Sequence, residues 1–166
     1  MSSQSNRYWG IALLSTLVFC GCMLPLNAPT GEIPIALLHN SYSCETSDEE
    51  AKLTVISDQN TYEGLWRRIN RSSLMPPSIP GTNFKRYVLV LVELGRRNNA
   101  GYGLILSASD ATINSGEVTL PVTAITPQSE TFTPQVMVSP CLLVQINRQG
   151  VDTVNALGIT RQVAPN

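Results

Sequence analysis

Short apolar segments separated by turn-forming residues run along most of the chain. They predict strands because valine, isoleucine and leucine dominate them, while glycine, proline, asparagine and aspartate lie between them. Residues 87–92, Tyr-Val-Leu-Val-Leu-Val, are apolar at every position, which is typical of a central strand covered on both faces. The predicted strands lie at residues 35–38, 52–56, 87–92, 102–107 and 136–146.

Two further segments carry weaker strand patterns. Apolar residues alternate at 118–122, but Pro121 lies among them and cannot donate a hydrogen bond to a neighbouring strand, so an edge or bulged strand is expected there. A turn is expected at 149–150, where a glycine follows a glutamine, and one more short strand at 151–157.

One segment has apolar residues at helical spacing instead. Its start is expected near Asn60, whose side chain can cap the first turn while Glu63 reaches back to it. Residues 76–81, Pro-Pro-Ser-Ile-Pro-Gly, are incompatible with a helix and with regular strand pairing, so a loop is expected after the helix. The apolar face of this helix consists of Tyr62, Leu65, Trp66 and Ile69.

These elements predict a mainly β fold of the α+β class, an antiparallel β-sandwich or partly closed barrel with one short helix. Residues 35–166 are expected to form a single domain, because a chain of this length suits one domain and shows no internal repeat. Residues 22–34 are expected to be a tether, since they contain Pro25, Pro29, Gly31 and Pro34.

The first 21 residues have the pattern of an export signal. Arg7 precedes an apolar run at 8–19, which is shorter than the roughly 20 residues that a membrane span needs. The ending Cys20-Gly21-Cys22 resembles the lipobox of bacterial lipoproteins, which implies a palmitate-bearing lipid on Cys22 and a place on the outer membrane facing the periplasm. A signal that is simply cleaved, or kept as an anchor, remains the alternative.

Composition restricts the classes of function. Eleven Lys and Arg residues against twelve Asp and Glu residues leave a net charge of −1, which offers no basic face to nucleic acid. Two of the four cysteines lie in the signal, and in an oxidising compartment Cys44 and Cys141 would either form a disulfide bond or remain two buried thiols. Neither belongs to a Cys-x-x-Cys motif or lies near another metal-ligand type, so no metal and no cofactor are expected.

No set of residues specifies a reaction. His39 is the only histidine and is expected to be solvated or to cap a chain end. The acidic residues at 48–50 are typical of a solvated turn, whereas Glu93 and Asp110 lie isolated near strand ends. We therefore predict that the protein is not an enzyme.

The segment that follows the central strand is a candidate for partner binding. It is expected to be the tip of a β-hairpin between the strands at 87–92 and 102–107, with two arginines and two asparagines exposed. The alternative is a turn whose charges only keep the protein soluble. The candidate residues are Arg96, Arg97, Asn98, Asn99, Gly101 and Tyr102.

Several short motifs occur in an order that resembles one known family. They are Leu65-Trp66, Asn83-Phe84, the segment from Gly95 to Tyr102, and Ser139-Pro140-Cys141-Leu142-Leu143-Val144. Over residues 55–146 the chain resembles the C-terminal domain of the protease-complex subunit PrcB family. The resemblance implies a bacterial envelope lipoprotein and a non-catalytic subunit that associates with a protease and stabilises it.

The sequence therefore predicts a lipid-anchored envelope protein that binds or stabilises a protein partner, with a protease as one such partner. Two alternatives remain open. A Gly-Tyr hairpin resembles the loop of chagasin-like protease inhibitors, and a hydrolase could use carboxylates that the fold brings together.

Overall fold

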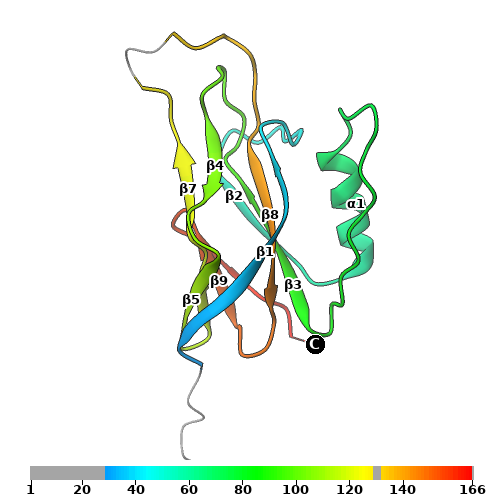
Figure 1. Cartoon of the computed structure of the whole chain (residues 1–166), viewed down its shortest axis with the longest axis vertical. Coiled ribbons are helices and arrows are strands. Elements are labelled where there is room, and N and C mark those ends of the chain that lie inside the picture. Colours follow the sequence, from blue (N-terminus) through cyan, green and yellow to red (C-terminus); the bar gives the residue numbers. More distant parts are fainter. Residues whose placement is uncertain (1–28, 129–131, 166) are drawn as a thin grey trace, which may run out of the picture.

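The computed structural model describes residues 29–128 and 132–165 (Figure 1). The predicted signal at 1–21 and the predicted lipid site Cys22 lie outside these residues. Within the part of the chain that is described, no helix has the length and hydrophobicity to cross a bilayer.

Across residues 29–128 and 132–165 the fold is mainly β, as the sequence predicts, with one helix. Eight strands form one sheet in the order β10-β9-β6-β5-β1-β8-β3-β2, and β10 also lies against β2, so that the sheet nearly closes into a barrel. All its strand pairs are antiparallel except β6 with β9. Two further strands, β4 and β7, form a small second sheet. The elements are β1 (Gly31–Ser41), β2 (Lys52–Ile56), α1 (Gln59–Ile69), β3 (Tyr87–Glu93), β4 (Gly103–Leu106), β5 (Asp110–Asn114), β6 (Glu117–Thr119), β7 (Val122–Ile125), β8 (Cys141–Asn147), β9 (Thr153–Ala156) and β10 (Ile159–Gln162).

The predicted central strand is confirmed as β3, which lies between β2 and β8. Alternate side chains of β3 enter two separate apolar clusters, because successive residues of a strand point to opposite faces. Val88, Val90 and Val92 belong to the cluster inside the barrel. Leu89 and Leu91 belong to the cluster between the sheet and α1, which covers this face in Figure 1.

Helix α1 forms where the periodicity predicts it, but its cap differs from the prediction. The first turn is capped by Asp58, whose carboxylate accepts hydrogen bonds from the backbone N–H of Thr61 at 2.9 Å and from its hydroxyl at 2.7 Å. Asp58 has the extended conformation that an N-cap requires, whereas Asn60 already lies inside the helix. Glu63 bonds to the side chain of Gln59 rather than reaching back to a cap.

Several strand boundaries differ from the prediction because pairing partners, which are distant in sequence, set them. Strand β1 begins at Gly31 rather than at residue 35, since its first residues pair with β5. The strand expected at 118–122 is instead two strands in different sheets, β6 and β7, separated at Pro121. Strand β8 begins only at Cys141, and neither β5 nor β10 was predicted.

The predicted β-hairpin at 95–101 is wrong. Strand β3 pairs with β2 and β8, whereas β4 pairs with β7, so the segment connects two sheets. Gly95 has a φ of +83° and packs so closely on the chain that an added Cβ would lie 2.5 Å from the carbonyl oxygen of Glu49. This close approach carries the chain out of the β3 ladder, and only glycine can make it.

Candidate partner-binding site

The connecting loop at residues 95–102 is held between two other irregular segments. On one side the backbone N–H of Arg96 donates to the carbonyl oxygen of Asp48 at 2.7 Å. On the other side Arg97 and Val138 exchange two backbone hydrogen bonds, of 2.8 and 2.9 Å, and the N–H of Ala100 donates to the carbonyl oxygen of Pro134. The connecting loop and residues 132–140 lie together at the end of the molecule beyond β4 and β7 (Figure 1).

The two arginines of this loop are engaged within the protein. Arg96 forms an ion pair of 3.1 Å with Glu49. The Nη1 of Arg97 donates to the backbone oxygen of Glu49 at 2.6 Å, and its guanidinium lies 5.8 Å from the centre of the Tyr102 ring. The predicted basic tip is therefore not a free cationic surface, because its charges fasten the loop to the acidic segment at 48–50.

A polar pocket of about 460 Å³ opens beside these arginines. Asn98 is exposed at its rim, whereas the side-chain oxygen of Asn99 is buried and accepts no hydrogen bond from the described residues. Because this oxygen is shielded from solvent, the exposed asparagine that the pocket offers to a bound molecule is Asn98. The pocket is lined by Glu49, Arg96, Arg97, Asn98, Asn99 and Tyr102.

An apolar pocket of about 370 Å³ lies on the other side of the same loop. Tyr42 is 68 % exposed and its ring lies over Gly103, while Ile125 of β7 is 39 % exposed. Met137, next to the lining residue Val138, is 65 % exposed. The pocket is lined by Tyr42, Ala100, Gly101, Gly103, Ile125 and Val138.

The loop residues could be named from the sequence, but the apolar side chains beside them could not. Tyr42 follows β1, Ile125 ends β7, and Val138 precedes β8, so three distant segments contribute them. An isolated exposed apolar residue has no distinctive sequence pattern. Only the fold shows that these residues lie together.

The predicted disulfide between Cys44 and Cys141 is present. The two Cα atoms are 5.9 Å apart, the cysteines are separated by 97 positions, and both are fully buried. The bond joins the irregular segment after β1 to the start of β8. Beside it, the N–H of Cys44 donates to the backbone oxygen and to the hydroxyl of Ser139, each at 3.0 Å.

In contrast to the prediction, His39 lies inside β1 and is half-buried. Its ring packs edge-on against Trp66 at 5.6 Å, and burial lowers the pKa of the imidazole below its ordinary value. His39 also lies beside both cysteines, although no ligand type was expected near them. The neutral imidazole is therefore the form favoured in the folded protein.

The acidic residues are found in two kinds of surroundings. Glu93, expected to be isolated, has a side chain that is only 3 % exposed and forms an ion pair of 2.9 Å with Arg68. Asp48 pairs with Lys52 at 3.0 Å on the surface. Together with Glu50 and Arg161, this segment borders a shallow pocket of about 390 Å³.

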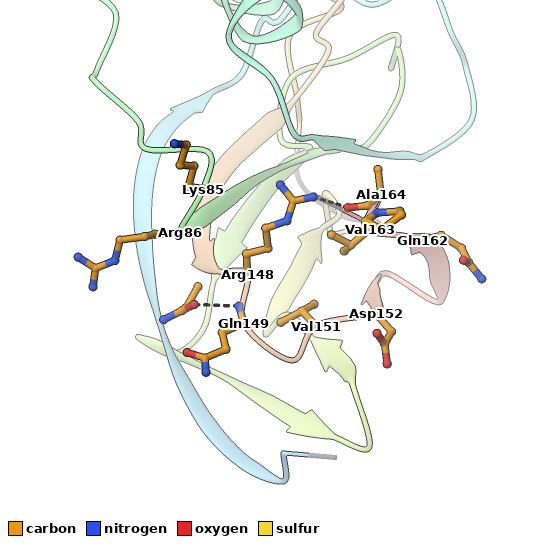
Figure 2. A pocket seen from close by; sticks show the side chains of 11 residues that line it. Lys85, Arg86, Arg148, Gln149, Val151, Asp152, Gln162, Val163 and Ala164 are labelled. Atoms are coloured by element: carbon orange, nitrogen blue, oxygen red, sulfur yellow. Dashed lines mark hydrogen bonds between the residues drawn. The ribbon is translucent and has the colours of Figure 1, made fainter. Parts of the chain in front are cut away.

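Another pocket, of about 630 Å³, lies at the opposite end of β8 near the C-terminus (Figure 2). Arg148, which is 9 % exposed, donates to the backbone oxygens of Phe84 and Ala164. Figure 2 shows its guanidinium between these chain segments, while the side chain of Arg86 points away from it. Arg148 therefore fastens the C-terminal segment to the loop before β3.

Comparisons with known proteins identify no relative. No protein-family model, no curated protein and no solved structure matches this chain.

Proposed function

We propose that this chain is a non-catalytic envelope lipoprotein that binds a protein partner through the connecting loop and the two pockets beside it. The observation that carries the proposal is the apolar pocket beside the connecting loop, where the exposed side chains of Tyr42 and Ile125 lie together. Exposed apolar clusters of this kind are typical of interaction sites, because leaving them in water is unfavourable. The resemblance to the PrcB family supports a protease as the partner.

The arrangement suits an extended segment of the partner. An apolar side chain of that segment would fill the pocket under Tyr42, which offers an exposed aromatic ring of the kind that dominates binding energy. Polar groups of that segment would meet Asn98 and Asn99 in the polar pocket on the other side of the loop. The hydrogen bonds that fix the loop mean that little ordering is needed on binding.

The membrane attachment in this proposal rests on the N-terminal sequence. Lipid on Cys22 would place the domain at the periplasmic face of the outer membrane, where its partner would also be found. Replacing Cys22 by serine should abolish incorporation of labelled palmitate and release the protein from membranes. The matched Cys20→Ser variant should keep both, and palmitate labelling that survives in the Cys22 variant would contradict the assignment.

The binding site is tested by recovering partners from crosslinked envelopes with variants of equal expression. Tyr42→Ser combined with Ile125→Ser should reduce recovery of the specific partner, since loss of one aromatic anchor commonly weakens binding by about 30-fold. Leu74→Ser combined with Met75→Ser is the matched control, because both residues are exposed and lie in the loop after α1. Equal recovery with both double variants would refute this site.

A further inference from the structure

An irregularity in β1 turns its histidine toward the helix. The register of β1 against β8 shifts between Leu37 and His39, so that Leu38 is an extra residue in the ladder. Such a bulge rotates the residues after it relative to the sheet, and bulges often occur where a side chain must be aimed at a site. Here the bulge places His39 against Trp66 and the disulfide.

Three ligand atoms of the kinds that zinc prefers meet at this point. A ring nitrogen of His39 and the sulfur atoms of Cys44 and Cys141 all lie within 4.8 Å of one another. The Nε2 atom of His39 is buried and has no hydrogen-bond partner among the described residues. Tetrahedral zinc at roughly 2.0–2.3 Å from each atom holds its ligand atoms about 3.5–3.8 Å apart. The imidazole would therefore have to approach the sulfur atoms by about 1 Å at most from this limit, whereas the two sulfur atoms, which are covalently bonded in the disulfide, would have to move apart.

We propose that His39, Cys44 and Cys141 form a zinc site when the disulfide is reduced. A dithiol reductant would break the bond between the two sulfur atoms by supplying two electrons and two protons, and would itself become a cyclic disulfide. Zn²⁺ would then displace the two thiol protons into solvent and bind two thiolates and one neutral imidazole.

The surroundings favour this cation. Two thiolates and a neutral imidazole around Zn²⁺ give a complex without net charge, which a buried site accommodates best. His39 is only half-buried, so an ion could enter from its side, and a water molecule could take the fourth position there.

The test uses the full chain with Cys20 and Cys22 replaced by serine, so that Cys44 and Cys141 are its only cysteines. The protein is reduced with a water-soluble phosphine and titrated with Co²⁺, which reports thiolate ligands by charge-transfer absorption, and Zn²⁺ is then added to displace it. We expect about one ion for each reduced chain and no such absorption in the oxidised protein.

Two substitutions distinguish loss of the proposed ligand His39 from a general disturbance of β1. His39→Gln should weaken Co²⁺ binding at least 10-fold. Loss of a residue that merely hydrogen-bonds to a metal ligand already lowers metal affinity by about 10-fold, and loss of a ligand itself should cost no less. Asn40→Ala, the adjacent residue of β1, should leave the affinity unchanged. Unfolding curves of the oxidised variants establish that each one folds.

Three results would overturn the proposal. The first is a reduced protein that gives no thiolate absorption with Co²⁺. The second is equal affinity in the parent and in His39→Gln. The third is loss of folded structure on reduction that Zn²⁺ does not restore, since the three ligands would then not be held together.

Discussion

The ion pair between Glu93 and Arg68 provides a sharp test of how this fold tolerates a buried charge. Glu93 ends β3 with a side chain only 3 % exposed, and Arg68 of α1 reaches it with a side chain 31 % exposed. The same Nη1 atom also donates to the backbone oxygen of Cys44 at 3.3 Å. Arg68 thus connects the helix, the central strand and the disulfide segment.

Arg68→Met removes the guanidinium but keeps an aliphatic stem of similar shape. Breaking a buried pair by removing one partner costs about 3–5 kcal/mol, because the remaining charge is left without compensation. Since almost a third of the Arg68 side chain is exposed, water can reach the pair and screen part of this cost. We therefore expect the free energy of unfolding to fall by about 2–3 kcal/mol.

Glu93→Gln should cost less than Arg68→Met. The amide can still accept a hydrogen bond from Arg68, and the arginine can turn toward solvent, so a loss of about 1 kcal/mol is expected. The variant with both substitutions should be more stable than the sum of the two losses implies, because it contains no unpaired buried charge.

Urea unfolding of the four proteins at neutral pH measures these differences, with equal m values as the condition for comparing them. Arg68→Lys serves as the control that keeps the charge. The reasoning is wrong if Arg68→Met is no more harmful than Glu93→Gln, or if the two losses add within about 0.5 kcal/mol.

Three other predictions concern the cap, the disulfide and the C-terminal segment. Asp58→Asn keeps an effective cap but removes a carboxylate whose pKa is lowered by the backbone hydrogen bond from Thr61, and then by that residue's hydroxyl. The stability that this lowered pKa provides is present above the ordinary value of 3.8 and lost as pH falls through the folded value, so melting temperatures should fall more steeply below about pH 4 in the parent than in the variant. Reducing the disulfide, which closes a loop with a sequence separation of 97, should lower the free energy of unfolding by about 4–5 kcal/mol in metal-free urea titrations. Arg148→Met should cost about 2–4 kcal/mol in the same assay and increase proteolysis of the C-terminal segment, because it removes hydrogen bonds to two backbone oxygens.

Each of these predictions has an outcome that contradicts it. Parallel pH profiles for the parent and Asp58→Asn would mean that the cap does not carry the acid sensitivity. A disulfide effect below about 1 kcal/mol would show that the segment around Cys44 is ordered without its covalent link. Unchanged protection of the C-terminus in Arg148→Met, with Arg86→Met as the exposed control, would mean that other contacts hold that segment.

Much of the fold followed from local patterns. The helix face around Trp66 and the strand at 87–92 were predicted because burial on one face, or on both, leaves a periodic trace in the sequence. Strand β2 also begins and ends at the predicted residues. The hairpin prediction failed because turn-forming residues at 95–101 indicate where a strand ends, but not which strand the chain pairs with next.

In the candidate site, too, some residues could be predicted from the sequence and others only from the tertiary structure. The connecting loop could be found from its glycines and charges, whereas the apolar residues beside it come from segments that only the tertiary structure brings together. The fold also decided that Arg96 and Arg97 bind the acidic segment rather than face solvent.

The sequence by itself determined the class of fold, the helix, the central strand and the two cysteines available for a disulfide bond. These properties depend on residue type and on spacing over a few positions, which a single chain displays directly. Only the tertiary structure decided the pairing of β4 with β7, the ion pair of Glu93 and the position of His39 beside the disulfide. Those features depend on contacts between residues far apart along the chain, which no local sequence pattern records.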